Sequence, residues 1–136
     1  MHIVKRLLGI YLLGTGAAVF LNLILTPLYH DASPDYPVWD VLNWFMAAGA
    51  IVALVFSAVR KWRGPDGDSL QSNAAYYGAI ALAMLFFWEW FWTLNPASET
   101  AEPVVISHIV YFPIVDALYT VLTVGVGSRV LRGGGE

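Results

Sequence analysis

Four long apolar stretches alternate with short polar segments along the chain. The apolar stretches cover residues 7–25, 38–59, 74–94 and 104–130, and each is close to or above the length of about 20 residues that an α-helix needs to cross a bilayer. The segments between them are rich in proline, glycine, serine and aspartate, which favour turns. The pattern predicts an all-α fold, an integral membrane bundle of four transmembrane helices in a single domain over residues 1–136.

The basic residues divide the polar segments into two classes. All seven fall on the side of the two termini: Lys5, Arg6, Arg60, Lys61, Arg63, Arg129 and Arg132. The two segments on the other side carry the acids Asp31, Asp35, Glu99 and Glu102 and no lysine or arginine. Because lysine and arginine are enriched in cytoplasmic segments, we expect both termini in the cytoplasm, and we expect the membrane to be a bacterial inner (plasma) membrane.

The first apolar stretch follows two basic residues, as the core of a signal peptide does. A signal-peptide core has about 7–15 apolar residues, and this stretch is long enough to span the membrane. No cleavage site of small residues follows it. We therefore expect it to be retained as a transmembrane helix.

Composition supports the membrane class and excludes several functions. The chain is 58% hydrophobic and 12% charged, against about 25% charged in soluble domains. Its net charge of -3 argues against a nucleic-acid partner. The absence of cysteine excludes disulfides, thiolate nucleophiles, iron–sulfur clusters and cysteine zinc sites.

At least one polar side chain is expected at a shallow depth on the extracytoplasmic side of every helix. Counting 1.5 Å per residue from the helix ends places Glu89 roughly 8 Å and His108 roughly 6 Å inside the boundary. A carboxylate among tryptophans needs a polar neighbour, and His108 is predicted to pair with Glu89. The full predicted outer-leaflet polar cluster is Glu89, His108, Asn22, Asn43 and Asp40. Three interpretations stay open: a clasp that holds the helices in register, a pocket for a ligand, proton or metal, and an accidental pattern in which these residues face different partners.

Asp116 is a second acid within an apolar stretch. Counting from residue 104 places it near the bilayer midplane, where a charge is most costly. It follows Pro113, whose missing N–H frees a carbonyl one turn earlier. Asp116 is interpreted either as a hydroxyl-bonded or protonated acid that faces the bundle interior, or as an acid that carries a proton.

No metal or cofactor is predicted. The weak metal candidates His30, His108 and Glu89 have no motif spacing behind them. A b-type haem usually takes two axial ligands within the bilayer, and only His108 lies within an apolar stretch.

Small residues four positions apart predict where helices approach closely. The predicted seams are Gly14 with Ala18 in the first stretch, Gly49 with Ala53 in the second, and Ala75, Ala79 and Ala83 in the third.

These patterns favour a small non-catalytic accessory or structural subunit of a larger membrane protein complex, which binds lipids or partner subunits. No nucleophile, nucleotide motif or metal motif is present, so an enzyme is disfavoured. One alternative is a small proton-coupled transporter that uses Glu89 and Asp116. Another is a membrane enzyme for a lipid-like substrate, with Glu89, His108 and Asp116 as acid–base groups.

Overall fold

The computed structural model describes residues 1–30, 36–95 and 110–133, and this part of the chain contains helices and no strand. The helices are α1 (His2–Tyr29), α2 (Pro37–Arg63), α3 (Leu70–Leu94) and α5 (Phe112–Gly133). All four are long and apolar enough to cross a membrane. The predicted all-α fold with four apolar helices is confirmed, and these helices indicate an integral membrane protein.

α1, α2 and α3 extend beyond the apolar stretches that predicted them. α1 begins at His2 and continues through Pro27, which we expected after its end, to Tyr29. Pro27 has no N–H to donate to the carbonyl of Leu23, so the end of α1 lacks one helical hydrogen bond. α5 begins at Phe112, with Pro113 as its second residue, and residues 110–111 before it are in a π-helical turn. The predicted start of this helix, residues 104–109, lies outside the described residues.

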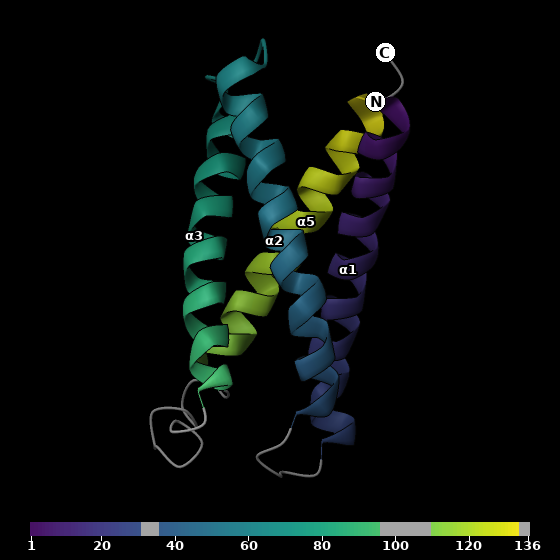
Figure 1. Cartoon of the computed structure of the whole chain (residues 1–136), viewed down its shortest axis with the longest axis vertical. Coiled ribbons are helices and arrows are strands. Elements are labelled where there is room, and N and C mark those ends of the chain that lie inside the picture. The colour runs from purple at the N-terminus through teal and green to yellow at the C-terminus, as the bar shows by residue number, and fades with distance from the viewer. Residues whose placement is uncertain (31–35, 96–109, 134–136) are drawn as a thin grey trace.

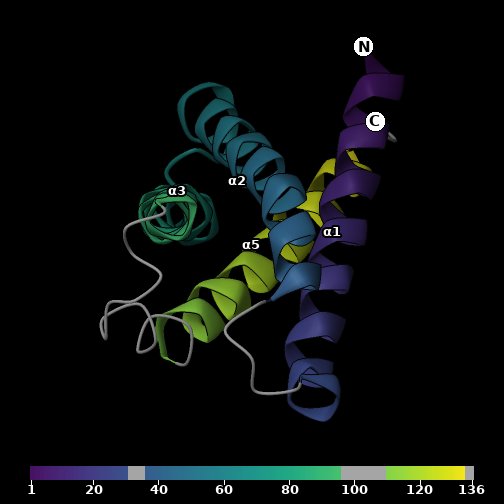
Figure 2. The same ribbon diagram turned by 60° about the horizontal axis from the view of Figure 1, so that its bottom comes forward.

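The helices form two pairs, and the pairs separate toward the end of the bundle where both termini lie (Figure 1). α1 lies beside α5 and α2 beside α3, while α5 runs diagonally behind α2 from α1 toward α3 (Figures 1 and 2). Both termini and the turn between α2 and α3 lie at the same end, which we call the terminal end (Figure 1). The opposite end, where α1 and α3 finish, is called the distal end. α5 is therefore the helix that connects the two pairs.

Two apolar clusters form the core of the bundle. The larger draws on all four helices and comprises Val19, Met46, Ala47, Ala50, Leu82, Phe86, Trp90, Val115 and Tyr119. The smaller joins α1, α2 and α5 nearer the terminal end and comprises Leu12, Ala53 and Val126. α3 contributes to the first cluster alone, in agreement with the separation of the helix pairs at the terminal end.

α1 and α5 approach each other through glycine. A Cβ atom at Gly127 would lie 2.9 Å from the carbonyl oxygen of Gly9, so the two backbones touch. The seam predicted on α1 is wrong, because Gly14 is exposed and Ala18 is only half-buried. Gly9 and Gly16 are the buried glycines of this helix. Residues 9 and 16 are seven apart and share one helix face, whereas residue 14 lies on another.

Tyr119 joins three helices in the middle of the bundle. It extends from α5, is fully buried, and donates a hydrogen bond of 2.9 Å from its hydroxyl to Thr15 Oγ1 on α1. Its ring lies over Gly49 on α2, where a Cβ atom would overlap the tyrosine hydroxyl. The predicted small residues Gly49 and Ala53 are buried, and Gly49 makes room for a tyrosine.

We predict that Gly127→Ala destabilises the bundle by about 1–3 kcal/mol, the usual cost of an added methyl in a packed site. The new Cβ atom meets backbone and the Cβ atom of Leu12, which cannot move independently of α1. Gly125→Ala is the matched control, because nothing lies within 4 Å of a Cβ atom at that position. Unfolding by denaturing detergent measures both variants, and equal stabilities would contradict the close contact.

Candidate functional site

Three polar side chains are buried in the apolar interior near the distal end. Asn43 on α2 is 4% exposed, and Glu89 on α3 and Asp116 on α5 are each 2% exposed. Such burial is unusual for carboxyl groups, which are rarely enclosed unless they are paired or protonated. We call these three residues the buried polar layer.

Helical spacing explains why these side chains point inward. Glu89 follows Leu82 and Phe86 at intervals of four and three residues, so it lies on the core-facing stripe of α3. Asp116 precedes Tyr119 by three residues, and Tyr119 precedes Thr123 by four, so Asp116 lies on the core-facing stripe of α5. The sequence of α3 does not show this stripe, because aromatic and other apolar residues occupy the remaining sides of the helix as well.

Packing contacts place the three residues at one level. Trp44 and Trp90, which follow Asn43 and Glu89 in the chain, meet edge to face with ring centroids 4.7 Å apart. Trp90 and Val115, the neighbours of Glu89 and Asp116, belong to the same core cluster. The layer therefore joins α2, α3 and α5.

Two oxygens of the layer have no hydrogen-bond partner among the described residues. They are Oδ1 of Asp116 and Oδ1 of Asn43, and both are shielded from solvent. Thr120 lies one turn away, but its hydroxyl donates to the backbone carbonyl of Asp116 at 3.0 Å and not to the carboxyl. Unsatisfied buried oxygens are costly, and a bound proton or an ordered water is the usual remedy.

Asn22 and Asp40, the other described members of the predicted polar cluster, lie outside the buried polar layer. Asn22 is half-buried at the distal end of α1 and accepts a hydrogen bond from the Tyr29 hydroxyl on the same helix. The neighbouring Thr26 accepts a 3.2 Å hydrogen bond from the Trp39 indole of α2. Asp40 is exposed. His108 lies outside the described residues, so the predicted pairing with Glu89 stays a prediction.

The metal candidates are likewise not brought together in the described part of the chain. His30 stacks on the Tyr36 ring with centroids 4.1 Å apart. No three histidine, aspartate or glutamate side chains converge on one point among residues 1–30, 36–95 and 110–133.

From the sequence, Glu89 and Asp116 are two separate predictions, a shallow acid in the outer cluster and an acid near the midplane. Counting from residue 104 put Asp116 near the midplane. Residues 104–109 lie outside the described residues, and Asp116 stands four residues after Phe112, the first residue of α5. Glu89 lies five residues before Leu94, the last residue of α3. The two counts are nearly equal, and this is the signal that would have paired them had the start of α5 been known.

Protein-family models, curated proteins and solved structures give no match to this chain. The chemistry of the site is therefore argued from its own geometry.

The buried polar layer can bind a proton. All seven lysines and arginines lie in helix segments at the terminal end, far from the layer. Two carboxyl groups in apolar surroundings resist simultaneous ionisation, because each charge raises the cost of the other. The amide of Asn43 on the facing helix can orient a carboxyl group or a water without adding charge.

We predict that Glu89 and Asp116 are energetically coupled. Stabilities of Glu89→Gln, Asp116→Asn and the double variant should deviate from additivity by about 0.5–3 kcal/mol, the range found for interacting residues. Asp40→Asn, which neutralises an exposed acid near the same end, should be additive with Asp116→Asn. Additivity in both cycles, measured by detergent-induced unfolding, would show that the two carboxyl groups do not interact.

Proposed function

We propose that the protein is a small proton-coupled membrane transporter in which Asp116 takes up and releases a proton and Glu89 modulates that step. One observation carries the proposal. Asp116 is 2% exposed, its Oδ1 atom has no hydrogen-bond partner among the described residues, and a second buried acid, Glu89, belongs to the same layer.

The cost of burying charge supports the neutral acid as the resting form of Asp116. An ionised carboxylate in hydrocarbon needs a cation or several donors, and the unpartnered oxygen has neither in the described part of the chain. Proton release then requires a change around the site, such as water entry or movement of a helix. A group that changes its proton occupancy only when the protein moves is suited to coupling.

The buried polar layer lies closer to the distal end of the bundle than to the terminal end. Asn43, Glu89 and Asp116 all stand within about two helical turns of the distal ends of their helices. Fully buried residues, Met46, Leu82 and Tyr119 among them, separate the layer from the terminal end. Proton exchange is therefore proposed with the distal side, and access from the other side would require the helix pairs to shift where Tyr119 connects them.

The test is infrared spectroscopy of the purified protein in lipid. We expect the carbonyl stretching band of a protonated carboxylic acid near neutral pH, and we expect Asp116→Asn to remove it. Glu89→Gln should shift the pH at which the band disappears, since the neighbouring charge is gone. Asp40→Asn is the control and should leave the band unchanged. A band that persists in Asp116→Asn would refute the assignment.

A non-catalytic accessory subunit is the second candidate, and the distal part of α3 favours it. Trp88, Phe91 and Trp92 are about half exposed or more, and they line a shallow groove on the outside of the bundle. Large aromatic side chains are enriched where membrane proteins meet partners and where they meet the bilayer interface. Proton flux into liposomes containing the protein alone distinguishes the candidates. Flux lost in Asp116→Asn supports transport, whereas no flux above empty liposomes favours the accessory subunit.

We also propose that the protein lies in a bacterial inner membrane and that its terminal end faces the cytoplasm. The support is the placement of all seven basic residues at that end.

Cysteine labelling tests the orientation, because the chain has no cysteine of its own. Pro65→Cys lies in the turn between α2 and α3, and Asn95→Cys lies at the distal end of α3; both positions are exposed. In intact spheroplasts, a membrane-impermeant maleimide should label residue 95 at once and residue 65 only after lysis. The reverse pattern would invert the topology.

A further inference from the structure

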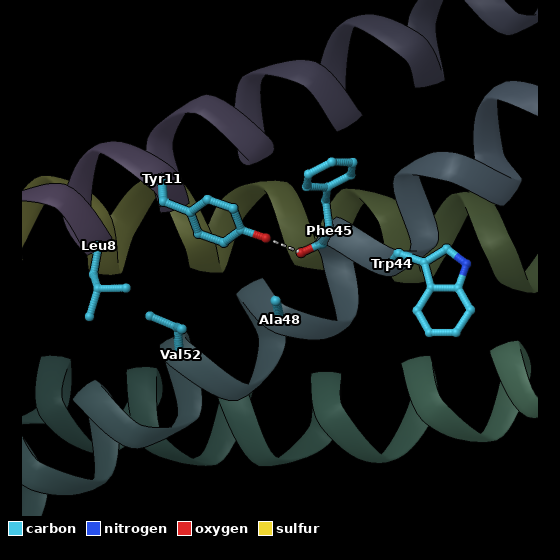
Figure 3. A pocket seen from close by; sticks show the side chains of 6 residues that line it. All are labelled: Leu8, Tyr11, Trp44, Phe45, Ala48 and Val52. Atoms are coloured by element: carbon cyan, nitrogen blue, oxygen red, sulfur yellow. Dashed lines mark hydrogen bonds between the residues drawn. The ribbon is translucent and has the colours of Figure 1, made fainter.

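An apolar groove opens on the outside of the bundle between α1 and α2. Its volume is about 420 Å³, and its walls are Leu8 and Tyr11 from α1 and Trp44, Phe45, Ala48 and Val52 from α2 (Figure 3). The Tyr11 hydroxyl crosses the groove and donates a 2.6 Å hydrogen bond to the carbonyl oxygen of Phe45. That bond satisfies the one hydroxyl among the lining side chains, so the groove offers a hydrocarbon surface.

Both walls of the groove lead to basic residues at the terminal end. On α1, Lys5 stands three residues before Leu8 and therefore on the same face, one turn farther out. On α2, Arg60 stands eight residues after Val52, about two turns farther toward the terminal end. Phe56, midway between them, packs against the smaller core cluster together with Tyr11 and Val52.

A third basic residue comes from α5, behind the groove. Arg129 lies between Gly127 and Leu131, and both of these contact Gly9: an added Cβ atom on Gly9 would be 3.0 Å from Leu131 Cγ and 3.3 Å from the Gly127 oxygen. Arg129 is therefore at the level of Leu8, the terminal residue of the groove. Its side chain is half-buried.

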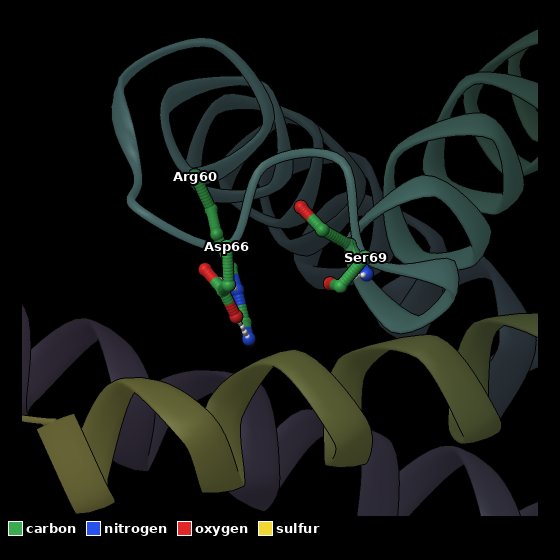
Figure 4. A network of polar contacts seen from close by, with 4 residues as sticks. Arg60, Asp66 and Ser69 are labelled. Carbon is green, nitrogen blue, oxygen red and sulfur yellow. Dashed lines mark hydrogen bonds and ion pairs between the residues drawn. The ribbon is translucent and has the colours of Figure 1, made fainter.

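Positive charge is in excess at this point. Arg60 of α2 is ion-paired with Asp66 in the turn that follows this helix, and both side chains extend toward α5 (Figure 4). The hydrogen bond from Arg60 holds the pKa of Asp66 below its usual value, so this carboxylate is ionised at neutral pH. Arg129 is within the fields of both Arg60 and Asp66. Asp66 pairs with Arg60, and Arg129 brings a second guanidinium group near this pair, so a further anion would relieve the repulsion between the two cations.

We propose that this groove binds one acyl chain of an anionic glycerophospholipid, whose phosphate lies among Lys5, Arg60 and Arg129. The apolar groove beside a basic cluster at the membrane boundary matches both parts of such a lipid. Basic pockets between transmembrane helices recognise anionic headgroups in this way. Guanidinium groups suit phosphate because their donors match its oxygens in pairs. This site is separate from the buried polar layer and does not depend on the proposed proton chemistry.

Native mass spectrometry of the detergent-solubilised protein tests the site with phosphatidylglycerol and phosphatidylcholine as probes. The wild type should retain phosphatidylglycerol preferentially. Arg129→Gln and Lys5→Gln should each weaken that binding about fivefold, the effect expected of one basic residue at the membrane surface. Lys61→Gln is the control of equal charge change, because Lys61 pairs with Asp68 and faces the Trp62 ring.

A second pair of variants tests the acyl-chain part. Ala48→Trp fills the groove from an exposed position and should reduce phosphatidylglycerol binding, whereas Ala81→Trp, at an exposed position on α3, should not. Equal weakening by Lys5→Gln and Lys61→Gln would show that the attraction is a general effect of net charge. Unchanged binding in Ala48→Trp would show that the groove holds no chain. Either result overturns the proposal.

Discussion

The contact between the backbones of Gly9 and Gly127 determines how α5 crosses the bundle. Between helices in a membrane there is no hydrophobic driving force, so close packing of small residues must supply the attraction. The two glycines bring α1 and α5 into direct contact near the terminal end. From there α5 runs diagonally to α3 (Figure 2). The path of this one helix carries Asp116 to the neighbourhood of Glu89.

Tyr119 occupies the point where the diagonal helix passes α2. It fills the space above Gly49 and bonds to Thr15, so one side chain contacts both helix pairs. Asp116 lies one turn away on the same face of α5. A movement that changed the surroundings of Asp116 would have to pass through this contact, which connects the proposed proton chemistry to the packing.

The two buried acids and the basic residues lie at opposite ends of the bundle. Acids are buried in the layer near the distal end, while every lysine and arginine is at the terminal end. The two groups need different surroundings. Basic side chains at helix ends reach the aqueous interface with their long stems, whereas a short carboxyl side chain within a helix depends on its protein neighbours. The proposed proton site and the proposed lipid site follow from these two environments.

The apolar stretches and the seven basic residues determined four helices and a common side for the termini, because length and hydropathy suffice for a helix in hydrocarbon. The same sequence identified Glu89, Asn43 and Asp116 as polar residues within spans, and their burial agrees with that expectation. It did not show that Asp116 and Glu89 share a level, and it chose Gly14 in place of Gly9 and Gly16 as the seam of α1. Those features depend on how α1 and α5 approach each other and how α5 crosses the bundle. The approach is set by contacts between residues more than 100 positions apart, such as Gly9 with Gly127, which no local pattern encodes.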